Sequence, residues 1–338
     1  MRVIGPLFGS LQEIPQNAAK SEALGFDGIY SAEINNDPFF PLLLAAEHSQ
    51  RVELMTSIAV AFARNPMTLA NLSHDLNQYS EGRFVLGIGS QIKPHITRRM
   101  SMPWSKPAAR MREFILAMQA IWRCWLEDAP LEFNGEFYRH DLMTPMFVPG
   151  TRDFPAPKVK LAGVGPLMTE VAGEVADGLI AHGFTTPRYL REVTLPALER
   201  GLQKGNRSRK DFDVVCPVIA VCGETEEKFV ASMNTVRVQL AFYASTPAYR
   251  PVLELHGWGD VQSEAHRMSK AGQWQAMGEL ITDEILNTFA VVAETPAQLA
   301  DKLKAHCGGL VDSWQCTWIS EDDEALNSVL QSIRENHD

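Results

Sequence analysis

The chain has 338 residues, of which 45% are hydrophobic and 21% charged, a composition typical of a globular protein. This composition excludes a mainly disordered chain and a collagen-like or coiled-coil fibre. Its 31 Lys and Arg against 41 Asp and Glu give a net charge of −10. Nucleic acids and anionic membranes both bind broad basic surfaces, so we expect neither as a partner.

The cysteines and the N-terminus indicate a cytoplasmic protein. The five cysteines are scattered and form no CxxC pair, which favours buried thiols in a reducing compartment. The first ten residues hold one basic residue and a short apolar run broken by Gly5 and Pro6, unlike a signal peptide. The sequence also lacks an apolar run of about 18 residues, the minimum for a membrane-spanning helix.

Short β-type runs alternate with helical patterns along the chain. Strands are predicted at 2–8, 27–33, 53–61, 83–89, 158–162, 178–181, 212–221 and 312–319. Helices are predicted at 14–24, 39–50, 66–78, 107–126, 166–176, 187–202, 224–242 and 296–307, with a last helix from Glu321. Repeated βα units predict an α/β fold with a parallel sheet, and eight of them favour a closed (β/α)8 TIM barrel.

Three segments interrupt the repeat. A long loop spans 90–106, a hairpin with Asn134–Gly135 as its turn is predicted within 131–147, and 243–290 is an insertion rich in aromatic and polar residues. Long ordered insertions in a barrel usually form a pocket wall or a lid. Because no low-complexity linker divides the chain, we expect one domain over 1–338.

Several common catalytic motifs are absent from the sequence. It contains no GxxxxGK[ST], HExxH, HxH or GxSxG, and its nine histidines are dispersed. A metal-dependent barrel hydrolase is therefore a weak alternative, and we expect no metal site. The pair Gly87 and Gly89 is only a GxG after a strand, which by itself is a weak cofactor signal.

In a TIM barrel the functional residues lie at the C-terminal ends of the strands. The predicted ends carry small residues, with one carboxylate at Glu33 and one imidazole at His182. A flat ring system could lie against such a surface. The run Gly163-Val164-Gly165-Pro166 opens a helix whose free N–H groups would suit a phosphate.

At these strand ends the sequence resembles the bacterial luciferase-like monooxygenase family, and within it the branch that depends on coenzyme F420, a deazaflavin. The resemblance covers nearly the whole chain. The stretches that carry it are GFDGIYSAE (25–33), TSIAVAFARNPMTLA (56–70), SEGRFVLGIGSQIKPH (80–95), LAGVGP (161–166), AGEVADGLIAH (172–182) and AFYASTPAY (241–249).

The resemblance implies a barrel with a deazaflavin or flavin at the strand ends, and commonly a homodimer or a larger assembly. It implies that Ser57, Ile58 and Ala59 back the ring of the cofactor, with a non-prolyl cis peptide at Ser57–Ile58. It further implies that Gly89, Ser90 and Gln91 contact the ring and the polar side chain. Gly163, Val164 and Gly165 match the turn that binds the phosphate and ribityl parts.

Three residues are candidates for acid–base chemistry. Several deazaflavin relatives carry His at the end of the second strand, where this chain has Glu33; a carboxylate there could move a proton, or only form structural hydrogen bonds. His95 lies in a basic loop that either clamps the phosphate-bearing tail of the cofactor or is simply solvated. His182 either contacts cofactor or substrate or is a buried core residue.

The aromatic and imidazole groups of the long loops have two readings as well. These groups either stack in a pocket or pack the insertion onto the barrel. The residues are Trp104, Tyr243, Tyr249, His256 and Trp258.

We therefore expect an oxidoreductase that transfers a hydride between coenzyme F420 and a small organic substrate. An FMN-dependent monooxygenase that inserts oxygen is the alternative within the family. A flavin-binding barrel without catalysis is the alternative of another class. The sequence favours no particular substrate.

Overall fold

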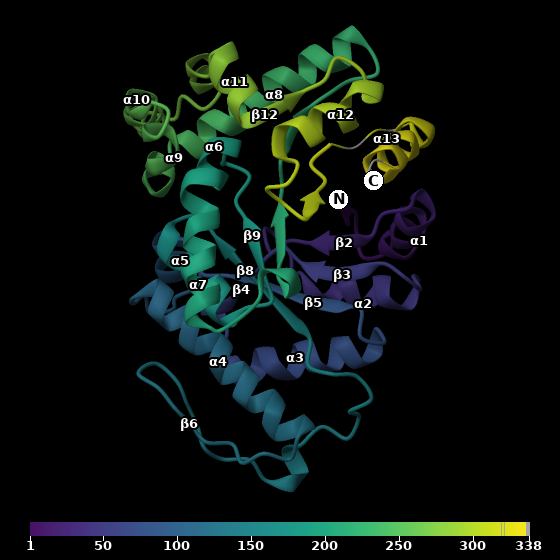
Figure 1. Cartoon of the computed structure of the whole chain (residues 1–338), viewed down its shortest axis with the longest axis vertical. Coiled ribbons are helices and arrows are strands. Elements are labelled where there is room, and N and C mark those ends of the chain that lie inside the picture. The colour runs from purple at the N-terminus through teal and green to yellow at the C-terminus, as the bar shows by residue number, and fades with distance from the viewer. Residues whose placement is uncertain (319, 321, 336–338) are drawn as a thin grey trace.

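A computed structural model of the chain describes residues 1–318, 320 and 322–335. Within these residues, eight parallel strands close into a barrel, since β3 pairs with both β2 and β5 (Figure 1). The barrel strands, in order around it, are β1 (Arg2–Pro6), β2 (Gly28–Ser31), β3 (Glu53–Thr56), β5 (Phe84–Gly89), β8 (Lys158–Gly163), β9 (Gly178–Ala181), β10 (Asp213–Cys216) and β13 (Ser313–Gln315). The predicted (β/α)8 barrel is confirmed.

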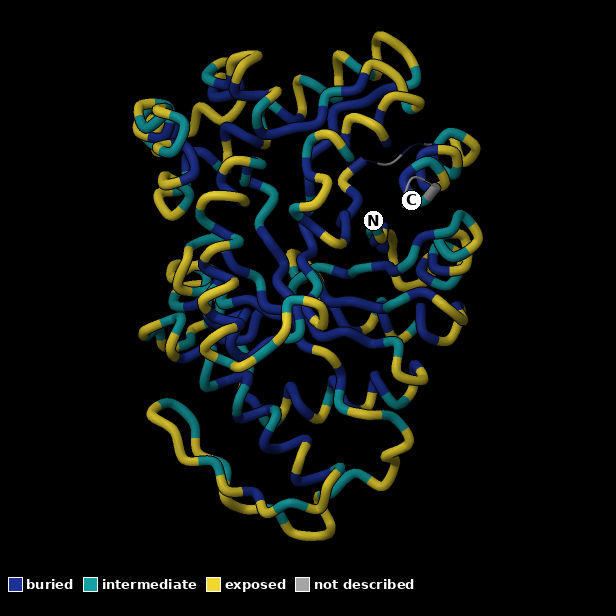
Figure 2. The backbone as a smooth tube through the Cα atoms, in the orientation of Figure 1, coloured by how far each residue is buried: buried dark blue, intermediate teal, exposed yellow. Residues whose placement is uncertain are grey.

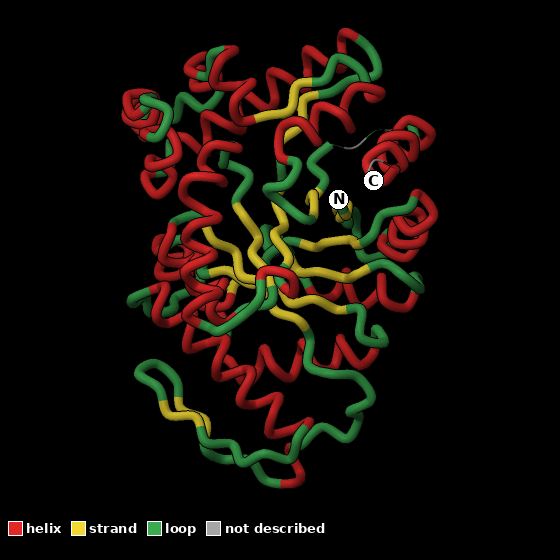
Figure 3. The backbone as a smooth tube through the Cα atoms, in the orientation of Figure 1, coloured by secondary structure: helices red, strands yellow, loops and turns green. Residues whose placement is uncertain are grey.

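Helices surround this barrel and cover its outer face (Figure 3). They are α1 (Ile14–Leu24), α2 (Phe39–Glu47), α3 (Pro66–Tyr79), α4 (Pro107–Leu126), α5 (Pro166–Val175), α6 (Pro187–Tyr189), α7 (Leu195–Lys204), α12 (Pro296–Cys307) and α13 (Asp323–Glu335). Local sequence sets several of their starts: the Asn65 side chain accepts the N–H of Thr68 at the start of α3, and Pro66 occupies the first turn. The predicted start of the last helix, Glu321, lies outside the described residues.

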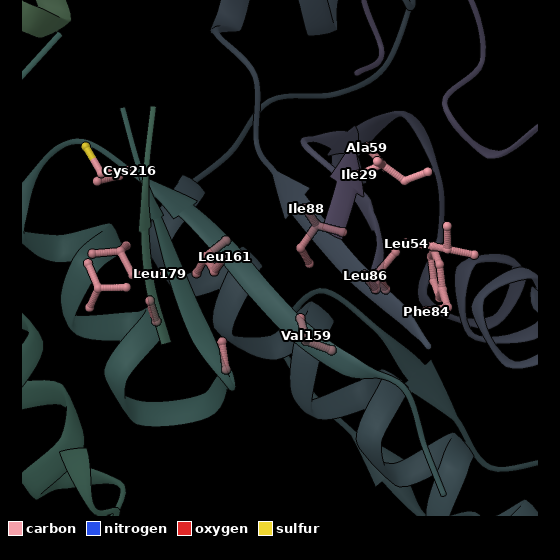
Figure 4. Packing of buried hydrophobic residues seen from close by; sticks show 14 of the residues in the cluster. Ile29, Leu54, Ala59, Phe84, Leu86, Ile88, Val159, Leu161, Leu179 and Cys216 are labelled. Atoms are coloured by element: carbon pink, nitrogen blue, oxygen red, sulfur yellow. The ribbon is translucent and has the colours of Figure 1, made fainter. Parts of the chain in front are cut away.

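The main core lies between the strands and these helices. Outward-facing side chains such as Leu54, Phe84 and Leu161 are fully buried there (Figure 4). Because successive side chains of a strand point to opposite faces, the alternate residues fill the barrel interior. Those residues form a second, smaller apolar group: Ile4, Met55, Val85, Ile180 and Val215.

The N-terminal end of the barrel interior is charged. Lys160 of β8 is 3% exposed, and its Nζ lies 3.0 Å from Glu53 Oε1 and 2.6 Å from Asp213 Oδ2. Arg2 of β1 lies 3.0 Å from the other oxygen of Glu53. Residues from four alternate strands thus close this end with ion pairs, which leaves the opposite end for the site.

The segment between β10 and β13 builds an additional layer above the barrel. Strands β11 (Ile219–Val221) and β12 (Ala290–Val292) pair in parallel, with Ala220 opposite Val291. Around them lie α8 (Glu226–Ala244), α9 (Arg250–Glu254), α10 (Gly259–Lys270) and α11 (Asp283–Phe289). Their apolar side chains form a separate buried cluster, so the insertion predicted at 243–290 is mostly helical and carries its own core.

The predicted hairpin is present, but the prediction that Asn134–Gly135 forms its turn is wrong. Strands β6 (Phe133–Asn134) and β7 (Arg139–His140) pair, and the loop between them runs from Gly135 to Tyr138. The N–H groups of Glu136, Phe137 and Tyr138 bind the Glu113 carboxylate of α4, which holds a longer loop than a two-residue turn. This arm is largely exposed (Figure 2).

Candidate active site

The C-terminal ends of several strands meet through direct side-chain contacts. Ser57, just after β3, donates its hydroxyl to Gln315 Oε1 of β13 at 2.7 Å. The Gln315 side chain also lies close enough to the phenol of Tyr30 on β2 to lower the pKa of that phenol. On β5, a Cβ built at Gly89 would lie 3.1 Å from Ile58 and 3.4 Å from Ala162 of β8. Five strand ends therefore converge on one mouth.

The turn after β3 brings together residues expected to back a ring. The Ser57–Ile58 peptide is cis, as predicted. Ser57 donates its N–H to Ser31 O at 2.8 Å, and β4 (Ala59–Val60) then pairs with the end of β5, with Val60 opposite Gly89. Ser57 and Ala59 of this turn have small side chains, so a flat group could approach its backbone there.

Glu33 supports this turn from the neighbouring strand. Its Oε2 accepts the N–H of Val60 at 2.8 Å and Arg64 Nη1 at 2.6 Å. Arg64 also binds Asp37 at 3.1 Å. The Glu33 carboxylate thus joins the loop after β2 to the turn after β3 through one backbone N–H donor and one guanidinium donor.

His182, immediately after β9, has a defined tautomer. Its Nδ1 accepts the N–H of Phe184 at 2.9 Å, so in the neutral ring the proton lies on Nε2 and is donated to Tyr249 Oη at 3.1 Å. The rings of Tyr243 and Tyr249 have centroids 4.9 and 4.5 Å from the imidazole. Burial lowers the pKa of His182 to about 4.

This lowered pKa makes a prediction for stability. The unfolded chain protonates His182 near pH 6.5 and the folded chain only near 4, so the stability that His182 contributes is complete above pH 6.5 and is lost as the pH falls towards 4. From pH 7 to pH 5 its share of the loss is roughly 2 kcal/mol.

The comparison is urea unfolding of the wild type and of His182→Gln at both pH values. The variant should lose roughly 2 kcal/mol less stability than the wild type over this interval. The matched control is His48→Gln, because His48 lies on the surface. Equal losses in the wild type and in His182→Gln would contradict the prediction.

Three phenols surround this imidazole and the mouth. Burial, with a smaller contribution from the nearby Tyr243 phenol, raises the pKa of both Tyr30 and Tyr249 to about 12. These two side chains therefore stay protonated at neutral pH. Because Tyr249 Oη accepts from His182, its own O–H is free to donate towards a bound molecule.

The glycine turn after β8 leads into α5 without a side-chain cap. Gly163 ends β8, Val164 follows, and Gly165 is the N-cap residue. A Cβ built at Gly165 would meet nothing within 4 Å, so the space beside this backbone is open. Pro166 has no N–H, so the free N–H groups at the start of α5 come from the residues on either side of it, where the positive end of the helix dipole lies.

The loop after β5 positions the remaining candidates. Ser90 donates its hydroxyl to Gln91 O at 3.1 Å, and Gln91 has a positive φ of 57°. His95 is half-buried at the start of a π-helical turn over His95–Arg99. Among the described residues, no hydrogen bond joins any two of the three predicted proton-transfer candidates, Glu33, His95 and His182.

Some of the aromatic residues from the long segments lie at the mouth, and others pack the protein around it. Tyr243 lies on α8 rather than in a loop, and with Tyr249 it contacts His182 at the mouth. By contrast, His256 stacks on Trp258 at 4.8 Å within the insertion. Trp104 packs edge-on against Phe62 at 5.8 Å.

The sequence did not lead us to predict Tyr30 and Gln315 as site residues. Their positions could have indicated it, because both alternate with apolar residues at the ends of barrel strands, in the register that points inward. A polar side chain at such a position indicates a lining residue of the mouth.

The family model described as luciferase-like monooxygenase matches residues 5–313. The chain belongs to the luciferase-like monooxygenase family. The chain is also 49% identical over 334 residues to an uncharacterised protein of Mycobacterium tuberculosis, and the match covers 99% of this chain and 98% of that protein.

Two further similarities concern proteins named for coenzyme F420. A putative coenzyme F420-dependent oxidoreductase of Mycobacterium tuberculosis is 27% identical over 304 residues, or 83% of this chain and 84% of that protein. The solved structure of a coenzyme F420-dependent tetrahydromethanopterin reductase from Methanopyrus kandleri superposes with a TM-score of 0.76 at 21% identity, covering 98% of this chain and 97% of that one. Among the described residues, no helix is long and apolar enough to span a membrane.

Proposed function

We propose that this chain transfers a hydride between coenzyme F420 and a small organic substrate. The observation that carries the proposal is the convergence of the strand ends on one mouth, in a chain whose relatives include a putative coenzyme F420-dependent oxidoreductase. The oxidoreductase chemistry agrees with membership of the luciferase-like monooxygenase family.

The residues at the mouth fit a deazaflavin. Ser57, Ile58 and Ala59 would back its ring. Gly89 lies beside them, and a larger residue at position 89 would press against Ile58. Ser90 and Gln91 would lie at the polar edge of the ring. The turn of Gly163, Val164 and Gly165, whose backbone is open at Gly165, would hold the phosphate. When bound, the deazaflavin supplies the two-electron chemistry.

His182 and Tyr249 form the favoured proton route. The neutral imidazole fixes the Tyr249 hydroxyl by donating to it, and the phenol O–H is left to donate to a substrate oxygen. Glu33, the first candidate from the sequence, is proposed instead as a positioning residue, because its carboxylate already holds Arg64 and Val60. His95 is proposed to contact the tail of the cofactor.

A test of this route is Tyr249→Phe, which keeps the ring and removes the hydroxyl. We expect kcat to fall about tenfold, the effect of losing one hydrogen bond to a developing charge. Tyr79→Phe is the matched control, since Tyr79 is exposed on α3. If kcat is the same in Tyr249→Phe and in the wild type, His182 and Tyr249 do not form the route.

An FMN-dependent monooxygenase is the second candidate, favoured by the family description itself. The test is anaerobic: the purified chain is mixed with coenzyme F420 or FMN and a panel of alcohols and aldehydes, and the visible absorption of the cofactor is followed. Turnover with coenzyme F420 in the absence of oxygen supports the proposal. Binding of FMN alone, with turnover only when oxygen is then admitted, would replace this proposal with the FMN-dependent monooxygenase. Binding of either cofactor without turnover would favour the non-catalytic barrel. The homodimer, the single domain and the cytoplasmic location stay predictions.

A further inference from the structure

A groove runs along α8 beside the mouth. It has a volume of about 420 Å³, within the usual range for small-molecule pockets. Five of its lining residues recur at helical spacing on one face of α8, and the sixth comes from the loop after α10. They are Thr235, Val238, Gln239, Phe242, Tyr243 and Trp274.

The lining is uncharged and largely aromatic or aliphatic, and its polar side chains are Thr235, which donates its hydroxyl to Ala231 O, and the pair Gln239 and Tyr243. None of these six side chains carries a charge. Phe242 and Trp274 are 51% and 47% exposed, and their ring centroids lie 6.0 Å apart, so two aromatic walls face solvent at the groove. Gln239 Nε2 donates to Tyr243 Oη at 3.3 Å, which leaves the Gln239 carbonyl as an acceptor and the Tyr243 O–H as a donor.

Tyr243 connects this groove with the candidate active site. Its ring contacts His182 edge-on at 4.9 Å, and its phenol lies close enough to Tyr30 to raise the pKa of that residue. The same side chain therefore forms the inner end of the groove and part of the mouth. A molecule lying in the groove would extend towards the strand ends.

The cation nearest to this face along α8 is already paired. Arg237 binds the carbonyl of Ile281 and the carboxylate of Asp283. An anionic ligand would lose water on entering the groove and would meet no charged lining residue in return.

We infer that this groove holds the apolar, ring-bearing part of the substrate, and that the substrate is a neutral aromatic compound with one oxygen read by Gln239 and Tyr243. The inference rests on the proposed function in one respect, which is that the bound compound is a substrate. The groove itself is a binding site whose occupancy is measured without catalysis.

The experiment is isothermal titration of the full-length protein with two probes of the same shape. The neutral probe is 2-naphthol, and the anionic probe is 2-naphthoate. We expect 2-naphthol to bind with 1:1 stoichiometry and 2-naphthoate to bind at least tenfold more weakly. Thr235→Trp should fill the groove from an exposed position and weaken 2-naphthol binding at least tenfold. Phe147→Ala is the control, because Phe147 is an exposed aromatic residue outside the groove lining.

The outcomes separate this inference from the proposed function. Equal or tighter binding of 2-naphthoate, or unchanged binding in Thr235→Trp, overturns the inference. Failure of 2-naphthol to bind a protein that does bind coenzyme F420 overturns it as well. Failure of coenzyme F420 to bind while 2-naphthol behaves as expected overturns the proposed function and leaves the groove as a site for neutral aromatic ligands.

Discussion

Replacing Lys160 with methionine is expected to lower the free energy of unfolding by about 3–5 kcal/mol, the usual cost of removing one partner from a buried ion pair. The Lys160 side chain is 3% exposed and lies between the carboxylates of Glu53 and Asp213. Methionine fills a similar volume but leaves these two carboxylates without their shared cation. Urea unfolding at pH 7 measures the loss.

The matched control is Arg2→Met, since Arg2 binds Glu53 and Asp213 from a position 44% exposed. We expect it to cost less than about 1 kcal/mol, as for other solvent-accessible pairs. A similar small loss in Lys160→Met would contradict the buried-pair account.

The pH dependence of the same variant adds a second check. Burial raises the pKa of Asp213, but the ion pair and hydrogen bond with Lys160 outweigh it and hold the pKa below its ordinary value. In the wild type this stabilisation is present above the unfolded pKa and is lost as the pH falls through the folded pKa. The penalty of Lys160→Met should therefore shrink in acid, where the Asp213 carboxylate becomes neutral.

The second large effect concerns the cofactor. Gly165→Val is expected to weaken binding of coenzyme F420 about 100-fold, which corresponds to about 2.7 kcal/mol. The added side chain would occupy the open space beside the first turn of α5 and keep a phosphate from its N–H groups. A charge-assisted hydrogen bond contributes about 1.5–3 kcal/mol, so losing this contact accounts for the effect.

The control is Gly150→Val, at another glycine whose Cβ would meet nothing within 4 Å. Both variants should keep a melting temperature close to that of the wild type, because neither added side chain meets a neighbour. Fluorescence titration with coenzyme F420 measures the affinities. Unchanged affinity in Gly165→Val would show that the phosphate binds elsewhere.

The architecture was predictable because local signals agreed with it. Each barrel strand overlaps a predicted β-type run, although the runs 53–61 and 212–221 each hold two strands instead of one. Helix starts such as Pro66 and Pro107 lie where proline fits the first turn. Strand pairing in a barrel follows chain order, so the topology needed no long-range information.

Other features depended on contacts that a sequence does not display. The Asn134–Gly135 pair suggested a two-residue turn, but the distant Glu113 holds a longer loop. Glu33 reads as a free carboxylate until Arg64 is placed beside it. The environment of His182 depends on Tyr249, which lies 67 positions away in the chain.

The central claim is that the strand ends form one seat for a planar ring with a phosphate tail. A crystal structure of the protein with coenzyme F420 bound tests it most directly. The account predicts the ring against Ser57, Ile58 and Ala59, and the phosphate at the N–H groups that follow Gly165. A ring bound away from the strand ends, or a phosphate away from the start of α5, would contradict it.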